Sequence, residues 1–133
     1  MVNCSVEEFH RDIVLEAENT VNTASDVTRH AELNLVSQAC QTLSAEDRAR
    51  ATLYTSTEPC AMCAGAIYWA GIKSVVYACP ASTLAEIAGP SLQCHADDVF
   101  NGAIDAPVLK GPMLEGQAAE QHLNYWSTQS WKD

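Results

Sequence analysis

Two cysteines near the middle of the chain are spaced so that they could share one metal ion. They occur in the segment Pro59-Cys60-Ala61-Met62-Cys63, at the expected start of a helix, so both sulfur atoms emerge on one side of its first turn. His30 lies thirty positions before Cys60, and Glu32 follows it two residues later. The sequence therefore offers three metal ligands and one acid.

This number of ligands favours a catalytic metal over a structural one. Structural zinc is usually held by four protein ligands, whereas catalytic zinc keeps one position open for water or substrate. With His30, Cys60 and Cys63 as its ligands, zinc would lower the pKa of a water molecule at that position. Glu32 would then carry protons to the substrate and to a departing amine. The pattern His-x-Glu followed by Pro-Cys-x-x-Cys is typical of this hydrolytic chemistry.

Each of these residues also has a simpler structural explanation. Glu32 could be an acid favoured by the positive end of a helix dipole, and His30 could be an ordinary loop histidine. The presence of the two motifs together outweighs both explanations. Cys94-His95 is a weaker second candidate for metal binding and is better explained as coincidence.

The segments around the motifs predict alternating helices and strands. Between Ala31 and Leu43, the apolar residues Leu33, Val36, Cys40 and Leu43 recur at helical spacing, so a helix begins just after His30 and turns this face to the core. A strand over Ala51–Thr55, a helix from Pro59 to Gly71 and a strand over Ser74–Cys79 predict a parallel βαβ unit.

The flanking segments complete one α/β domain over residues 1–133. No internal repeat or low-complexity linker divides it. The further expected elements are a hairpin of Val2–Val6 and Ile13–Leu15, a loop over Asn19–Arg29, a helix over Ser82–Gly89, a loop over Leu92–Asn101, a strand over Pro107–Lys110, and a helix over Leu114–Trp126.

Composition limits the partners of the chain. It has 133 residues, of which 47% are apolar, and seventeen acids against seven bases give a net charge of −10. Such a surface repels phosphate backbones, so nucleic acid is an unfavourable partner and a small neutral substrate suits it better. The apolar stretch Pro59–Ile72 is too short to cross a membrane. No export signal is recognised and the cysteines suit a reducing compartment, so we expect a cytoplasmic location.

The segment from Asn19 to Ala78 resembles the cytidine deaminase-like superfamily. The likeness rests on D-V-T-R-H-A-E-L and T-E-P-C-A-M-C-A-G-A-I-Y-W-A-G-I-K-S-V-V-Y, and it is nearest to the guanine deaminase and tRNA adenosine deaminase branch, in particular to small bacterial free-base or nucleoside deaminases. The resemblance implies a three-layer α/β/α fold with a mixed five-stranded sheet, and usually a dimer. The helix with which the family begins is missing here.

The resemblance also implies roles for individual residues. It makes His30, Cys60 and Cys63 the zinc ligands, and Glu32 the proton shuttle. The amide of Ala31 would touch the substrate. Two further sets of residues are suggested by the same likeness. Asn19 would bind the base, with a turn residue as the less favoured alternative. Asp97 or Asp98, and Trp126 or Trp131, are candidates for closing the pocket.

We therefore expect a zinc-dependent aminohydrolase that deaminates a free heterocyclic base, such as guanine, ammeline or cytosine, and releases ammonia. Two alternatives remain. A tRNA adenosine deaminase shares the zinc motifs but must grip a phosphate backbone. A catalytically inactive zinc-binding module is compatible with the missing first helix, although an intact Glu32 argues against it.

Overall fold

All strands in the described part of the chain belong to one sheet. The computed structural model describes residues 3–7, 12–113 and 115–126. The strands are β1 (Asn3–Glu7), β2 (Ile13–Glu18), β3 (Thr52–Thr57), β4 (Ser74–Cys79) and β5 (Val108–Lys110). They are arranged in the order β2-β1-β3-β4-β5. Strand β1 is antiparallel to both of its neighbours, whereas β3, β4 and β5 are parallel, so the sheet is mixed, as predicted.

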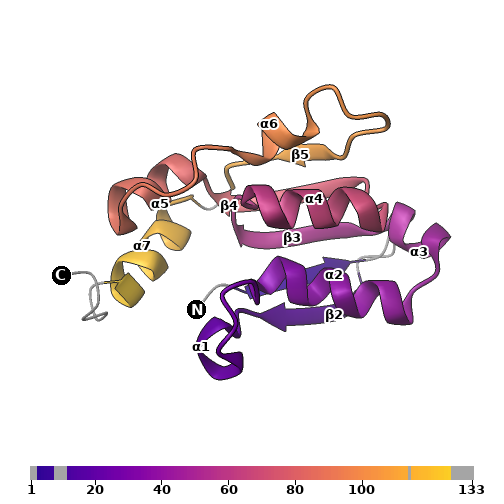
Figure 1. Ribbon diagram of the computed structural model, residues 1–133, viewed down its shortest axis with the longest axis horizontal. Coiled ribbons are helices and arrows are strands. Elements are labelled where there is room, and N and C mark those ends of the chain that lie inside the picture. The colour runs from indigo at the N-terminus through magenta and orange to yellow at the C-terminus, as the bar shows by residue number, and fades with distance from the viewer. Residues whose placement is uncertain (1–2, 8–11, 114, 127–133) are drawn as a thin grey trace.

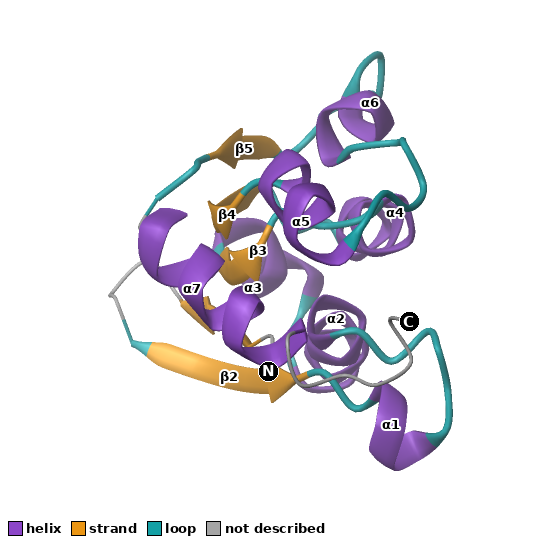
Figure 2. Ribbon diagram, turned by 90° about the vertical axis from the view of Figure 1, so that its left-hand side faces the viewer, coloured by secondary structure: helices purple, strands orange, loops and turns teal. Residues whose placement is uncertain are grey.

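Helices cover both faces of this sheet. They are α1 (Val21–Ala24), α2 (Ala31–Thr42), α3 (Ala45–Arg50), α4 (Ala61–Ala70), α5 (Ala81–Ala88), α6 (Ala96–Phe100) and α7 (Glu115–Trp126). Helices α2 and α4 lie next to each other on one face (Figure 1). Figure 2 shows α7 on the other side of the strands. The predicted three-layer α/β fold is confirmed, and among the described residues no helix comes before β1.

The core lies between the sheet and the pair α2 and α4. Leu35 of α2, Leu53 of β3, Ile67 of α4 and Val75 of β4 are fully buried there. Along β3, the odd-numbered residues Leu53, Thr55 and Thr57 are buried, whereas the residues between them are more exposed, because successive side chains of a strand point to opposite faces. The same alternation brings two polar residues, Thr55 and Thr57, to the end of the strand near the metal-binding motif.

The buried face of α2 differs from the predicted one. Leu35, Val36 and Ala39 are buried, whereas Cys40 is exposed. The helix contacts both β2 and α4, so its buried stripe is turned toward the space between them. Spacing alone could not identify which of two overlapping apolar stripes meets two neighbours at once.

Three short helices were not predicted. Helix α6 replaces part of the loop expected over 92–101, α1 lies within the loop expected over 19–29, and α3 follows α2. Each has four to six residues, which is too short for helical periodicity to show. The remaining sequence signal for such a short helix is a residue that caps its first turn. At α3, the Ser44 hydroxyl accepts from the Asp47 amide, 3.1 Å away. At α6, the Asp98 carboxylate accepts from the His95 amide, 2.9 Å away.

Other helices and strands begin or end a few residues from the predicted positions. Strand β2 continues to Glu18, and β3 runs to Thr57. Pro59 lies before α4 rather than in its first turn, since Cys60 is the N-cap residue. Trp131 lies outside the described residues. Among the described residues, none of the helices has the length and apolar character needed to span a membrane.

Candidate metal and proton-transfer site

His30 is held at the start of α2 by the turn that precedes it. It is the N-cap residue, with extended backbone angles, so its side chain stands at the end of the helix rather than along its side. In the turn, the Asp26 carboxylate accepts hydrogen bonds from the amide and the hydroxyl of Thr28, at 2.9 and 2.6 Å, and these bonds lower the pKa of Asp26. A self-contained turn thus fixes the direction from which the chain enters α2.

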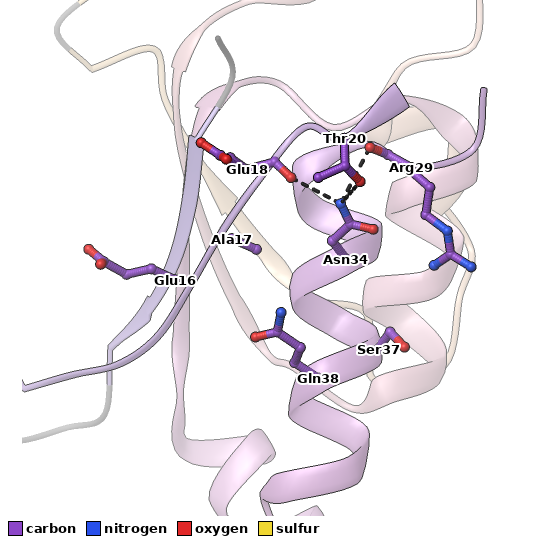
Figure 3. A pocket seen from close by; sticks show the side chains of 8 residues that line it. All are labelled: Glu16, Ala17, Glu18, Thr20, Arg29, Asn34, Ser37 and Gln38. Atoms are coloured by element: carbon purple, nitrogen blue, oxygen red, sulfur yellow. Dashed lines mark hydrogen bonds between the residues drawn. The ribbon is translucent and has the colours of Figure 1, made fainter. Parts of the chain in front are cut away.

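Asn34 ties the same turn to the sheet. Its side-chain amide lies 2.9 Å from the Glu18 carbonyl, 2.9 Å from the Thr20 hydroxyl and 3.4 Å from the Arg29 carbonyl, as Figure 3 shows. These bonds connect α2 with the end of β2 and with the residue before His30. They lie at one end of a groove of about 450 Å³ between β2 and α2. The residues that line this groove support the turn before His30 and do not include the candidate metal ligands.

Cys60 and Cys63 occupy the first turn of the helix beside α2. Cys60 is the N-cap of α4 and Cys63 is its third residue. The segment before them is fixed on two sides, because the Glu58 carboxylate accepts from the Ala81 amide at 3.2 Å and lies 3.6 Å from Nδ1 of His95. The backbone of Cys60 also forms a bridge with His95. The chain is therefore anchored where the cysteines leave the sheet.

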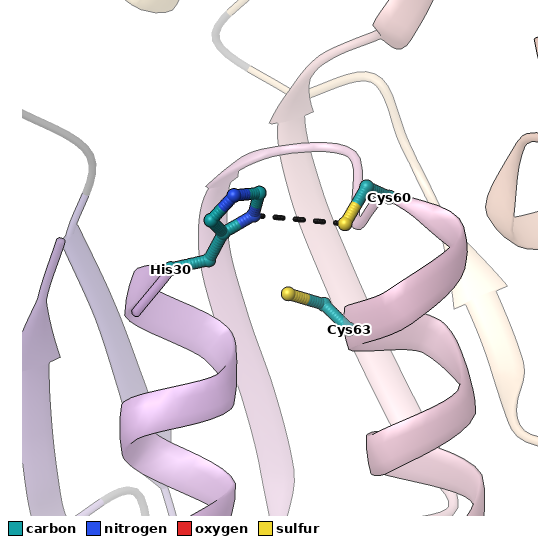
Figure 4. Close-up of side chains that lie close together, drawn as sticks. All are labelled: His30, Cys60 and Cys63. Atoms are coloured by element: carbon teal, nitrogen blue, oxygen red, sulfur yellow. Dashed lines mark hydrogen bonds between the residues drawn. The ribbon is translucent and has the colours of Figure 1, made fainter. Parts of the chain in front are cut away.

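The three candidate ligands converge in space. Ligand atoms of His30, Cys60 and Cys63 all lie within 4.8 Å of one another. Nδ1 of His30 is 3.6 Å from Sγ of Cys60, and Figure 4 shows the three side chains turned toward a common point between α2 and α4. Cys63 is fully buried, while the other two are half-buried. The cluster is thus shielded from solvent at Cys63 and partly accessible to solvent at His30 and Cys60.

The electrostatics of the cluster favour a thiolate. The hydrogen bond from Cys63, together with that from His30, lowers the pKa of Cys60 to about 4. The same sulfur–sulfur hydrogen bond, followed by burial, raises the pKa of Cys63, since its proton is the one that is shared. The hydrogen bond to Cys60 raises the pKa of His30. One negative charge is therefore already stabilised at the cluster, as a cation site requires.

The donor set fits a zinc ion. Two sulfurs and one imidazole nitrogen are ligands that zinc prefers, and three protein ligands are the number found in catalytic zinc sites. Among the described residues, no fourth His, Cys, Asp or Glu side chain joins this cluster. Cys94 and His95 do not join it: His95 is instead placed beside Glu58.

Glu32 lies in the first turn of α2 and is enclosed by the protein. Its side chain is 4% exposed, and this burial raises the pKa of its carboxyl. The hydroxyl of Thr55 on β3 donates to its Oε1 at 2.8 Å. A carboxyl with a raised pKa next to a metal-ligand cluster is a suitable acid or base.

A second buried polar contact lies close by. Nε2 of His122 on α7 is 2.6 Å from the Thr57 hydroxyl, and both side chains are 6% exposed. Burial lowers the pKa of His122. The C-terminal helix is therefore fastened to the end of β3, three residues before Cys60.

The remaining candidates have different surroundings. Oδ1 of Asn19 accepts from the Val21 amide at 3.0 Å, so part of this side chain serves a turn. Ala31 is buried next to His30. Asp97 and Asp98 are exposed residues in the first turn of α6. Trp126 is the last residue of α7, and the structure does not describe its side chain.

Sequence reasoning missed Asn34, Thr55 and the contact of His122. Polar residues at strand and helix positions have no motif of their own, and their roles come from partners 14 to 65 residues away. The one available signal was the pair Thr55 and Thr57 at alternate positions of β3, because polar residues on the buried face of a strand need partners.

Comparison with known proteins agrees with this geometry. Residues 1–79 match the family model of the cytidine and deoxycytidylate deaminase zinc-binding region. The chain is 33% identical over 128 residues to a protein of Schizosaccharomyces pombe named "Probable cytosine deaminase", covering 92% of this chain and 77% of the relative. It is 47% identical over 74 residues to the guanine deaminase of Bacillus subtilis, covering 56% of this chain and 47% of that enzyme.

The fold is shared with a solved enzyme as well. The structure of guanine deaminase from Nitrosomonas europaea superimposes with a TM-score of 0.79 over 95% of this chain and 72% of that one, at 24% sequence identity. At this identity the likeness concerns the fold alone. Taken with the convergent ligand cluster, these matches show that the chain belongs to the cytidine and deoxycytidylate deaminase family of zinc-dependent hydrolases.

Proposed function

We propose that this protein removes the amino group of a free heterocyclic base by hydrolysis, and that the base is guanine or a relative such as cytosine or ammeline. The observation that carries the proposal is the buried Glu32 carboxyl beside the convergent cluster of His30, Cys60 and Cys63. The two relatives described above are named for deamination of free bases, which supports a small substrate.

In this proposal His30, Cys60 and Cys63 hold a zinc ion. Such an ion supplies a water molecule of lowered pKa and polarises the reacting centre. Neutral imidazole and two thiolates compensate its charge while leaving one coordination position for chemistry. The first turn of α4 also presents its amides and the positive end of its dipole toward the site, which favours the thiolate forms.

Glu32 moves the protons. Hydrolysis forms a bond between the ring carbon and a water oxygen and breaks the bond to the amino nitrogen. Both protons of the water therefore move, one to the ring nitrogen and one to the departing ammonia. Glu32 accepts each proton in turn and passes it to the substrate. Its raised pKa suits this exchange, because proton transfer is most efficient when the pKa of the carrier lies nearer to the working pH.

Substrate contacts are proposed for Ala31, the first residue of α2, and for Asn19, which directly follows β2. The amide of Ala31 would donate to the base, and the side-chain amide of Asn19 would recognise its polar edge. Oδ1 of Asn19 already accepts from the Val21 amide, but an amide oxygen has a second lone pair. The side chain of Asn19 can therefore both donate to the base and accept from it.

We further propose a homodimer in the cytoplasm. Helix α4 buries Cys63, Ala64, Ile67 and Ala70, yet its outer face leaves Trp69 86% exposed. A helix that is apolar all round is usually buried on every side, and a second copy of the chain would cover this face. Reducing conditions in the cytoplasm would keep the cysteines available for metal.

The test is ammonia release from the zinc-loaded protein. Wild type and Glu32→Ala are compared over guanine, cytosine, adenine, ammeline and their nucleosides, with Glu46→Ala, an exposed acid on α3, as the matched control. We expect release from at least one free base by wild type and the control. For Glu32→Ala we expect a loss of about a hundredfold or more in kcat.

Two outcomes would overturn the proposal. A zinc-loaded protein that releases no ammonia from any member of the panel would be a binding module instead. Tight, salt-sensitive binding of tRNA in a filter assay at low salt, with deamination of its adenosine, would replace a free base by RNA. The net charge of −10 makes this second result unexpected, because seven basic residues are few for a phosphate backbone.

A further inference from the structure

Among the described residues, the buried Glu32 carboxyl has few polar partners. It is 4% exposed, and among the described residues no lysine or arginine forms an ion pair with it. The carboxyl accepts hydrogen bonds from its own backbone amide and from the Thr55 hydroxyl, the latter at 2.8 Å. Because a buried charged group without a hydrogen bond is costly, this hydroxyl has a large influence on where the carboxyl can lie.

Thr55 is itself held firmly. It is 5% exposed and lies in the middle of β3, where it is paired with Cys4 of β1 on one side and with Tyr77 of β4 on the other. Its Oγ1 also lies 3.0 Å from the carbonyl of Thr57. A side chain on a central strand is a more rigid support than one on a loop.

The polar contacts continue beyond Thr55. Thr57, whose carbonyl faces the Thr55 hydroxyl, has its own hydroxyl 2.6 Å from Nε2 of His122. The end of β3 is thereby fixed from the side of α7 as well. A continuous set of contacts runs from Glu32 through Thr55 and Thr57 to His122, and nothing in the ligand cluster is part of it.

We propose that Thr55 is the positioning residue for Glu32. This inference rests on the proposed function, in which Glu32 must stay beside the reacting atoms. The Thr55 hydroxyl lies 2.8 Å from Oε1 of Glu32, and its own position is set by the central strand and by the Thr57 carbonyl 3.0 Å away. Thr55 thus determines where the Glu32 carboxyl lies relative to the ligand cluster.

The activity test compares Thr55→Val with Thr55→Ser. Valine keeps the shape and the preference for a strand but removes the hydroxyl, whereas serine keeps the hydroxyl. The matched control is Thr52→Val, a half-buried threonine on the same strand. For Thr55→Val we expect kcat to fall by about ten- to a hundredfold, with KM and zinc content unchanged. Thr55→Ser restores most of the rate, and Thr52→Val leaves it unaltered.

A thermal test does not depend on activity. Thr55→Val is introduced into wild type and into Glu32→Ala, and the melting temperatures of the zinc-loaded proteins are compared. We expect a clear drop in the presence of Glu32 and little or none in its absence, since the hydroxyl then has no carboxyl to support. Equal drops in both backgrounds, or an unchanged kcat in Thr55→Val, would overturn the inference.

These two measurements also separate the inference from the proposed function. If wild type deaminates no base, the proposed function fails, and the thermal comparison still decides whether Thr55 supports Glu32. If wild type is active and Thr55→Val equals it, the function stands and the positioning role is wrong.

Discussion

Nδ1 of His30 and Sγ of Cys60 lie 3.6 Å apart, although thirty residues separate them in the chain. One atom stands at the start of α2 and the other at the start of α4, and the two helices pack side by side on the same face of the sheet. The ends of two parallel-lying helices thereby contribute to one ligand cluster. Each ligand comes from a helix N-cap or first turn, where backbone amides also favour negative charge.

The first prediction concerns metal content. Cys63→Ser removes a fully buried ligand, so we expect zinc stoichiometry to fall from about one per chain to near zero, because three protein ligands are already the minimum of such sites. Cys40→Ser is the control, since Cys40 is exposed on α2. Metal analysis after dialysis gives the result. Full zinc content in Cys63→Ser would show that the metal binds elsewhere.

The second prediction concerns the support of His30. Asn34→Ala removes an amide that contacts Glu18, Thr20 and Arg29, so we expect a loss of about 1–3 kcal/mol in unfolding free energy. We also expect weaker zinc binding, because the entry into α2 is loosened. Gln38→Ala, one helical turn further on and exposed in the same groove, should cost less than about 0.5 kcal/mol. Equal losses in chemical denaturation would contradict the assigned role.

The third prediction is a dependence of stability on pH. Burial lowers the pKa of His122 from its ordinary value of 6.5, so below that pH the unfolded chain binds a proton that the folded chain does not. Stability contributed by this residue is present above about pH 6.5 and is lost as the pH falls toward its folded pKa, by at most about 1.4 kcal/mol per pH unit.

The measurement is the difference between wild type and His122→Gln in unfolding free energy from pH 7.5 to pH 5. Other titrating groups are shared by the two proteins, so their contributions cancel in the difference. The advantage of wild type should shrink as the pH falls. A difference that stays constant over this range would mean that His122 titrates alike in both states.

The fourth prediction concerns the outer face of α4. Trp69→Glu places a charge at an exposed apolar position, so we expect the proposed dimer to dissociate, seen as a change from dimer to monomer in light scattering. Val108→Glu is a control on β5, at a position that is also exposed. A dimer that persists in Trp69→Glu, or a monomeric wild type, would remove α4 from the proposed interface.

Much of the site could be predicted from the chain alone because its chemistry is local. The types and spacing of Cys60 and Cys63 within one helical turn, and of Glu32 two residues after His30, are properties of short segments. The helix that begins after His30 followed from periodicity, and the parallel pairing of β3 with β4 followed from the order strand, helix, strand. Short elements such as α6 were missed, because five residues show no period.

The sequence by itself determined which ligands and which acid are available, and which family the chain belongs to. Only the tertiary structure decided that the imidazole meets the thiols, that Thr55 supports Glu32 and that His122 fastens α7 to the end of β3. The physical reason is one of range. Side-chain chemistry and helical periodicity can be recognised within a segment of a few residues. Contacts across 23 to 65 residues depend instead on the order of the strands and on the face of the sheet on which each helix packs.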